Sequence, residues 1–360
     1  MKKVALFTAN TQGGIIQFTL QIYETLKKNG IDTKVFLPSD VKGSDLSVIA
    51  DDDLCKYDKV KAVFDKRPYR VTANEIMHLS PDAVFYMDNS PVSQNVGLYL
   101  KKDIKQFMTL HDAGTYHPTN KLHIRERLVR AYTAAVNKRF CKKVTSFVLL
   151  SKESLKTFIG ANPGYADRTI LMPLGAHLPH DAKCALSEAE NIQNGFFLFF
   201  GRIDKYKGIG NLLEAYKDIA DKALPLVIAG NGEFTDNENR LIEECKNLTV
   251  IKRYITDGEM KWLLSRSTAV VLPYIEATQS GVIPLSYIYE KPVIVSNVPG
   301  LTQFVVDGRT GFICGTKEQW QQRLLSVDKA AAEKMSADIK EYYNNTLDWD
   351  KNISEFIKHI

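Results

Sequence analysis

The sequence predicts an α/β protein built from two doubly wound parallel sheets in tandem. Short apolar runs alternate with segments of helical spacing, which is typical of parallel strands joined by crossover helices. The chain has 360 residues, 44% of them apolar, which is enough for two separate cores. The alternation is broken once, over 172–192, where Pro173, Gly175 and Pro179 indicate a linker.

We therefore expect an N-terminal domain over residues 1–175, a C-terminal domain over 190–335 and a final helical segment over 336–360. Trp349 and Phe356 are the expected apolar anchors of that last, otherwise polar segment. In a doubly wound sheet, ligands bind beyond the carboxyl ends of the strands. Two such domains facing each other are therefore expected to enclose a ligand in an interdomain cleft.

Each expected strand is a short, nearly continuous apolar run, as in buried parallel sheets. In the first domain these runs are Lys3–Thr8, Thr33–Leu37, Ala83–Met87, Gln106–Leu110 and Ser146–Leu150. In the second they are Phe196–Phe200, Leu226–Ala229, Leu248–Ile251, Ala269–Leu272 and Pro292–Ser296. A helix is expected over Ile16–Lys28, because its apolar residues have helical spacing and Asn29-Gly30 is a stop signal.

Composition favours a cytoplasmic protein. No apolar run approaches the roughly 18 residues that cross a bilayer, and the apolar part of Met1–Thr8 is too short for a signal peptide. The five cysteines are dispersed and lack metal-ligand spacing, so we expect free thiols in a reducing compartment. They are Cys55, Cys141, Cys184, Cys245 and Cys314.

Positive charge is concentrated between Lys101 and Lys143, although the net charge of the chain is only +5. The segment contains eleven Lys and Arg residues but only three acids, Asp103, Asp112 and Glu126. One interpretation is a solvated helix face. The other is a patch that meets an anionic membrane surface or a lipid-phosphate acceptor. Nucleic acid is disfavoured, because no aromatic interleaving or nucleic-acid motif accompanies the charge.

Two glycine-containing loops are candidate phosphate sites. Gly13 and Gly14 join the first strand to the first helix, where backbone amides are available to an anion. The spacing is not G-x-G-x-x-G, so NAD binding is disfavoured, and a plain tight turn is the alternative. In the loop Gly201–Ile209, Arg202 offers a planar fork and Lys207 a point charge to phosphate oxygens. Surface charges on a loop are the alternative there.

Two further groups follow predicted strands. Glu276 comes after Ala269–Leu272, and the residues that follow it, Thr278 to Gly281, are candidates for a helix start that holds phosphate. A solvated Glu is the alternative. His111 follows the strand Gln106–Leu110 and is a candidate donor to a sugar hydroxyl or phosphate, with a structural role as the alternative. His117 and His123 do not complete a metal site.

The triplet Asp51–Asp53 suggests at first sight an Asp-x-Asp manganese site. It lies in a polar stretch rich in turn formers, however, so a surface loop is the favoured interpretation.

Together these motifs resemble family 4 of the retaining GT-B glycosyltransferases, a group rich in bacterial polysaccharide and lipopolysaccharide enzymes. The resemblance covers nearly the whole chain and is strongest from Phe196 to Phe312. Beyond the two glycine loops and the stretch Glu276–Val282, it rests on Ala229-Gly230-Asn231-Gly232, Lys291-Pro292-Val293-Ile294 and Asp307–Phe312.

The resemblance assigns roles to particular residues. Arg202 and Lys207 are expected to hold the donor diphosphate, with Gly13 and Gly14 against it from the other domain. Glu276 is expected to face the donor sugar and His111 its reacting carbon. Backbone amides are expected from Gln279, Ser280, Gly281 and Val282, and the base is expected beside Tyr254 and Ile255. The region of Trp349 resembles the helix that crosses back to the first domain.

The activity implied is metal-independent transfer of a sugar from a nucleoside diphosphate to a hydroxyl of a glycan or lipid-linked acceptor, with retention. No cofactor is expected besides this donor substrate. The family usually has a second Glu that holds the ribose, but Pro284 or Leu285 stands at that position, so the base and sugar stay open. A nucleotide-sugar epimerase or dehydrogenase is disfavoured, since it needs a dinucleotide fingerprint. A non-catalytic GT-B subunit that binds a nucleotide sugar or a partner is the remaining alternative.

Overall fold

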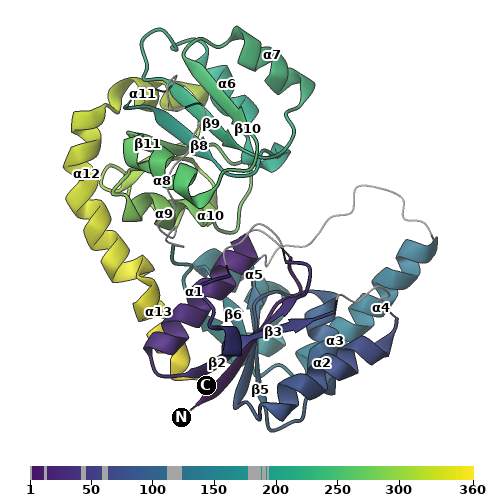
Figure 1. Cartoon of the computed structure of the whole chain (residues 1–360). Helices are drawn as coiled ribbons and strands as arrows, with labels where there is room; N and C mark the ends of the chain where they lie inside the picture. The colour runs from purple at the N-terminus through teal and green to yellow at the C-terminus, as the bar shows by residue number, and fades with distance from the viewer. Residues whose placement is uncertain are drawn as a thin grey trace. The chain divides into compact units, whose positions relative to one another are not determined.

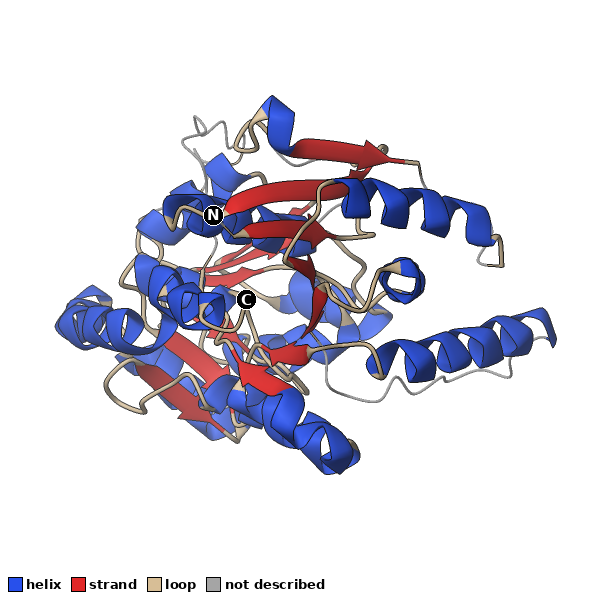
Figure 2. Ribbon diagram, turned by 90° about the horizontal axis from the view of Figure 1, so that it is seen from below, coloured by secondary structure: helices blue, strands red, loops and turns tan. Residues whose placement is uncertain are grey.

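The computed structural model describes residues 2–11, 14–41, 46–58, 64–111, 124–176, 188, 192 and 194–360. Their contacts form two compact units, Met1–Pro173 with Asp350–Ile360, and Leu174–Trp349. Each unit contains one parallel sheet with helices beside it (Figures 1 and 2). The predicted fold class, two Rossmann-like α/β sheets, is therefore confirmed.

The first unit holds a seven-stranded sheet of order β3-β2-β1-β4-β5-β6-β7. Its strands are β1 (Lys3–Phe7), β2 (Asp32–Pro38), β3 (Leu54–Tyr57), β4 (Ala83–Tyr86), β5 (Lys105–Leu110), β6 (Ser146–Leu149) and β7 (Thr169–Leu171). Its helices are α1 (Gly14–Lys28), α2 (Lys66–His78), α3 (Pro91–Tyr99), α4 (Ile124–Cys141) and α5 (Lys152–Ala161). Strand order runs outward from β1 on one side and from β4 on the other. The switch point, where such sheets bind ligands, therefore lies between β1 and β4.

The second unit holds a six-stranded sheet of order β10-β9-β8-β11-β12-β13. Its strands are β8 (Phe197–Phe200), β9 (Leu226–Gly230), β10 (Leu248–Lys252), β11 (Ala269–Leu272), β12 (Val293–Ser296) and β13 (Gly311–Cys314). Its helices are α6 (Ile209–Tyr216), α7 (Asp236–Glu244), α8 (Asp257–Arg266), α9 (Val282–Ile288), α10 (Pro299–Thr302), α11 (Lys317–Ser326) and α12 (Lys329–Tyr342). By the same argument, its switch point lies between β8 and β11.

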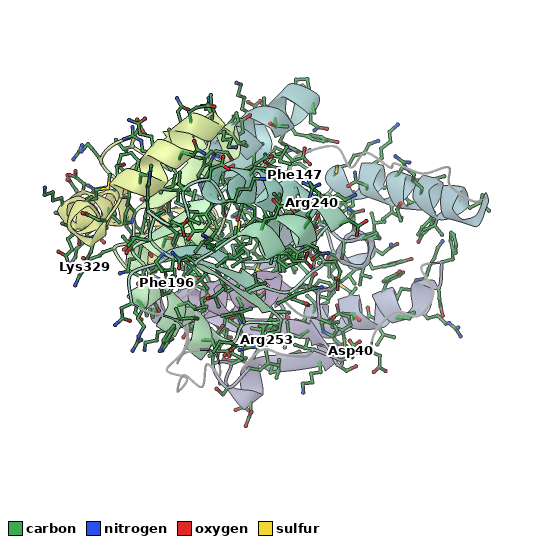
Figure 3. The ribbon with its side chains drawn as sticks, turned by 90° about the horizontal axis from the view of Figure 1, so that it is seen from above. Asp40, Phe147, Phe196, Arg240, Arg253 and Lys329 are labelled. Carbon is green, nitrogen blue, oxygen red and sulfur yellow. The ribbon has the colours of Figure 1, made fainter. Side chains whose placement is uncertain are left out.

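Apolar side chains of the strands build a separate core in each unit. Phe147 of β6 and Phe196, next to β8, are labelled in Figure 3 and are both buried. Phe196 belongs to the core cluster of the second sheet, and Phe147 to a cluster of the first. This burial explains why these strands could be recognised as apolar runs.

The chain leaves the second unit inside its last helical segment. Helix α12 contacts α9, a π-helical turn follows over Tyr343–Leu347, and α13 (Trp349–Ile357) comes next. Trp349 packs on Gly175, where an added Cβ would lie 2.4 Å from the indole ring. Phe356 belongs to the first unit, with its ring centroid 4.5 Å from that of Phe85. Within the expected final segment 336–360, the contacts join Asp350–Ile360 to the first unit.

Asp51–Asp53 forms a short 3-10 helix rather than the expected surface loop. Asp53 is buried, and its carboxylate pairs with Lys27 and Lys34, each at 2.9 Å. Burial alone raises the pKa of Asp53, but hydrogen bonds from Lys27, Lys34 and Tyr23 lower it to about 2. The surface-loop interpretation is therefore wrong for Asp53, because its carboxylate fastens α1 and β2.

Three strands, β3, β7 and β13, were not expected from the sequence. Among the described residues, none of the helices combines the length and apolar character needed to span a bilayer.

Candidate active site

Two loops of the second unit meet at the switch point of its sheet. The first follows β8 and contains a short 3-10 helix, Lys205–Lys207. The second follows β11, and its Ile275 N–H donates to the carbonyl oxygen of Tyr206 at 2.8 Å. Gly208 has a φ of +64°, and a Cβ there would lie 2.0 Å from the carbonyl oxygen of Pro273. Only glycine permits this approach, so Gly208 fixes the spacing of the two loops.

Arg202 and Lys207 both lie on the first of these loops but in different environments. The Arg202 side chain is 67% exposed, and its Nη2 lies 3.5 Å from Asp204 Oδ2. Lys207 is half-buried, with its Nζ 3.7 Å from the ring centroid of Tyr274 and 5.0 Å from that of Tyr206. Burial, together with the positive charge of Arg202 and against the opposing charge of Asp204, lowers the pKa of Lys207 to about 7. The loop therefore offers one mobile cation and one confined cation to an anion.

The second loop is held at several points of its backbone. Ser296 Oγ donates to the carbonyl oxygen of Tyr274, and Gln303 Nε2 donates to that of Thr278 at 3.2 Å. Gly300 lies so close that a Cβ there would be 2.0 Å from the Ala277 carbonyl oxygen. Glu276, by contrast, is exposed. The loop is thus a rigid support for an exposed carboxylate.

The amides expected to bind phosphate lie just before and at the start of α9. Gly281 is exposed, and Gln279 is half-buried. Ser280 is buried, and its Oγ accepts from the Val282 N–H at 3.3 Å, so that amide has a partner within the loop. Pro284 and Leu285, which stand where the family has its second Glu, are both buried in α9.

Tyr254 and Ile255 follow β10 and differ in exposure. The Tyr254 side chain is 55% exposed, whereas Ile255 is buried in the core. Arg253, labelled in Figure 3, pairs with Glu259 and with Glu188, each at 2.8 Å. Its ion pairs fix the chain next to Tyr254. Because the side chain of Ile255 is buried, this residue can offer a ligand only its backbone, whereas the exposed Tyr254 can offer its ring.

In the first unit, a carboxylate that the sequence analysis missed organises the switch point. Asp88 follows β4, is buried, and accepts from Thr8 Oγ1 at 2.5 Å and from Ala9 N at 2.6 Å. It also accepts from Ser93 Oγ at 2.7 Å and Ser90 N at 2.9 Å. Burial raises its pKa, but these hydrogen bonds outweigh burial and lower it. Asp88 therefore ties the loop after β1 to the start of α3. The available signal was an Asp directly after an apolar run.

His111 lies at the carboxyl end of β5 in the same unit. Its Nε2 donates to the Met87 carbonyl oxygen at 2.8 Å, since a carbonyl only accepts. Its ring meets that of Phe18 edge-on at 5.1 Å. Gly14 begins α1, and a Cβ there would meet nothing within 4 Å. Gly13, His117 and His123 lie outside the described residues.

The structure thus gathers Arg202, Lys207 and the loop with Glu276 at one switch point, and places Tyr254 two strands away, after β10. His111 and Gly14 belong to the other sheet. Polar and charged side chains beyond the carboxyl ends of the strands occupy the position where doubly wound sheets bind ligands. This is the architecture of the GT-B glycosyltransferases.

Comparison with known proteins shows which proteins this chain is similar to. Residues 186–346 match the family model of glycosyl transferases group 1. The chain is 24% identical over 312 residues to O-antigen chain mannosyltransferase C of Escherichia coli, an alignment covering 82% of this chain and 78% of that protein. It is 30% identical over 114 residues to a GDP-mannose:glycolipid 4-beta-D-mannosyltransferase of Xanthomonas campestris pv. campestris, covering 31% of this chain and 32% of that protein.

Solved structures support the fold. The structure of Anabaena HepE in complex with UDP-glucose has a TM-score of 0.74 and 14% sequence identity, covering 100% of both chains. The chain is therefore a glycosyltransferase with the GT-B fold and a group 1 domain over 186–346. The family resemblance seen in its motifs is confirmed.

Proposed function

We propose that this glycosyltransferase moves a hexose from a nucleoside diphosphate to a hydroxyl of a glycan or lipid-linked acceptor, with retention, in the synthesis of a cell-surface polysaccharide. The observation that carries the proposal is the pair Arg202 and Lys207 at the switch point of the second sheet. The E. coli relative, an O-antigen chain mannosyltransferase, and the HepE complex with UDP-glucose support the acceptor class and the donor class.

In this proposal the protein acts chiefly by stabilising the departing diphosphate. The guanidinium of Arg202 and the ammonium of Lys207 neutralise the charge that develops when the bond to the sugar breaks. Each such donor contributes about 2–4 kcal/mol in the transition state. These two cations fill the role that a metal ion has in other sugar transferases, so the proposed reaction uses neither a metal nor a cofactor.

The remaining roles follow the family resemblance. Glu276 faces the donor sugar, and Tyr254 with the backbone of Ile255 holds the base. Gln279 to Val282 border the diphosphate, with Gly281 as the exposed amide. His111 and Gly14 of the first unit are assigned to the donor sugar and the diphosphate.

Retention requires that the acceptor oxygen reach the anomeric carbon on the face that the diphosphate leaves. In the proposed step, the acceptor oxygen bonds to that carbon as the bond to the diphosphate oxygen breaks. The acceptor proton passes to the departing oxygen. No protein nucleophile is needed.

Thermal unfolding with UDP, GDP, dTDP, ADP and CMP tests the donor site. A ligand at about a hundred times its dissociation constant stabilises the folded protein by about 2.7 kcal/mol. We expect a shift with one nucleotide and its loss in Arg202→Ala. Arg240→Ala is the matched control, because Arg240 is an exposed arginine of α7 in the same unit. A shift that Arg202→Ala retains would contradict the assignment, and no shift with any nucleotide would contradict the donor site.

We further propose that α4 brings the enzyme to the cytoplasmic face of a membrane. Leu128 of α4 is 63% exposed, and the exposed Phe64 lies 4.9 Å from Tyr132, one helical turn further along α4. No acidic residue occurs between Leu128 and Lys143, while Arg130, Lys138, Arg139 and Lys142 are exposed. Each such cation contributes about 1 kcal/mol near an anionic bilayer.

Sedimentation with lipid vesicles tests this contact. We expect binding to phosphatidylglycerol-containing vesicles, no binding to pure phosphatidylcholine, and loss of binding in Lys138→Glu/Arg139→Glu. Equal sedimentation of the variant and the unchanged protein would show that these residues form an ordinary solvated helix face.

A further inference from the structure

Lys207 lies against two tyrosine rings at the switch point of the second sheet. Its Nζ is 3.7 Å from the ring centroid of Tyr274 and 5.0 Å from that of Tyr206. The two rings meet at an angle of 74° with their centroids 6.2 Å apart, so they form a corner around the ammonium. Tyr274 is fully buried and Tyr206 is half-buried. We refer to Tyr206 and Tyr274 as the aromatic cradle.

No hydrogen bond or ion pair of Lys207 Nζ with another described residue accompanies these ring contacts. The charged groups that face it are Arg202, which repels it, and Asp204, which attracts it but lies next to Arg202. Ring faces attract a cation weakly, by about 0.5–2 kcal/mol, and do not replace its water shell. The ammonium form of Lys207 is therefore poorly compensated in the cradle until an anion arrives.

Tyr274 also joins this lysine to the loop that precedes α9. Its hydroxyl lies 3.3 Å from Ser280 Oγ, and the same Oγ accepts from the Val282 N–H at 3.3 Å. The carbonyl oxygen of Tyr206 accepts from Ile275 N at 2.8 Å, so the cradle also links the two loops through the backbone. The position of the lysine and the shape of the loop after Glu276 therefore depend on one side chain.

We propose that Tyr206 and Tyr274 are positioning residues of the donor site, holding Lys207 dehydrated so that the donor diphosphate binds together with a proton taken up by this lysine. The inference rests on the proposed function and deepens it, because it specifies how the lysine is presented. The ligand class is a nucleoside diphosphate sugar, whose diphosphate supplies the counter-charge that the rings lack.

The consequence is measurable because burial lowers the pKa of Lys207 to about 7. At pH 8, about nine-tenths of the free protein then has a neutral lysine, and binding of the diphosphate restores the proton. Donor affinity should fall by about tenfold for each pH unit above 7. A lysine held only for packing would show neither effect.

Isothermal titration calorimetry at pH 8, in two buffers of different ionisation enthalpy, counts the protons taken up. The probes are UDP-glucose and GDP-mannose, whose phosphate groups keep a constant charge around this pH. We expect close to one proton per bound ligand for the unchanged protein and none for Lys207→Arg, because arginine keeps its charge. Lys205→Arg is the matched control, since Lys205 is exposed on the same loop, and its proton uptake should be unchanged.

The cradle variants separate positioning from packing. Tyr206→Ala opens the site to water, so proton uptake should fall well below that of the unchanged protein. Tyr274→Phe keeps the ring but loses the bond to Ser280, so affinity should fall several-fold while proton uptake persists. Binding without proton uptake, or uptake that Lys207→Arg or Tyr206→Ala leaves intact, would overturn the inference alone. No binding of either probe to the unchanged protein would overturn the proposed donor site, and the inference with it.

Discussion

Replacing Lys207 with methionine should stabilise the protein in the absence of ligand. Burial lowers the pKa of this lysine from 10.5 to about 7, so the folded protein disfavours the charged form. Between these two values the unfolded chain binds more protons than the folded one, and stability rises with pH. The cost of the buried charge is therefore complete below pH 7 and disappears as the pH approaches 10.5. A methionine has a similar length and no charge.

The magnitude follows from the size of the shift. Each pKa unit corresponds to about 1.4 kcal/mol, so the buried charge of Lys207 destabilises the folded protein by at most about 5 kcal/mol. Lys207 keeps partial contact with solvent, and its contacts with the two rings are lost in the variant. We therefore expect Lys207→Met to raise the free energy of unfolding by about 2–3 kcal/mol at pH 6.

Urea unfolding at pH 6 and pH 9.5 measures this difference, with Lys205→Met as an exposed control. The midpoint of Lys207→Met should exceed that of the unchanged protein at pH 6, and the gap should narrow at pH 9.5. A variant that is less stable at pH 6, or a gap that does not depend on pH, would refute the reasoning. Such a stabilised variant should also fail to bind a nucleotide sugar, which is the usual trade between stability and function.

Three further predictions follow from the structure. Gly208→Ala should abolish donor binding and destabilise the protein by at least about 2 kcal/mol, because its Cβ would lie 2.0 Å from the Pro273 carbonyl oxygen at a φ of +64°; a nucleotide thermal shift that survives would contradict the close approach. Asp53→Asn should lower the free energy of unfolding by about 2 kcal/mol at pH 7 and by nothing below about pH 2, because the pKa of Asp53 is lowered from 3.8 to about 2 and the stabilisation by its carboxylate is lost as the pH falls through that range. In urea unfolding, the difference in stability between the variant and the unchanged protein should be smaller at pH 3 than at pH 7. Asp88→Asn should weaken donor binding more than it lowers the melting temperature, because Asp88 organises the loop after β1; an unchanged affinity would limit Asp88 to a structural role.

The strands at the centre of both sheets were predictable because burial on both faces requires continuous apolar runs. Ala269–Leu272 was predicted with the bounds that the structure gives it. The strands β3 and β7 were not predicted, because they are the two edge strands of their sheet, are short, and are mostly half-buried. Their backbone hydrogen bonds are made with a neighbouring strand, so the local sequence alone does not predict that they are strands.

The candidate site was predictable where a residue's chemistry and its place after a strand agree. Arg202 and Lys207 follow a predicted strand, and cations there favour a bound anion. The cradle was not predictable, since Tyr274 lies far from Tyr206 and Lys207 in sequence and meets them only after folding. Asp88 and Asp53 were missed or misread for a related reason. The burial of a single carboxylate depends on partners that other elements supply, so it cannot be recognised from the neighbouring sequence.

The most direct test of the central claim is release of nucleoside diphosphate from a nucleotide sugar by the purified protein. UDP-glucose and GDP-mannose would each be incubated with the protein and extracted bacterial glycolipids, with Arg202→Ala and Arg240→Ala in parallel. The account predicts release from one donor, a loss of about a hundredfold or more in Arg202→Ala, and full activity in Arg240→Ala. Binding of a donor with no release would show a non-catalytic binding protein, and full activity in Arg202→Ala would contradict the proposed site.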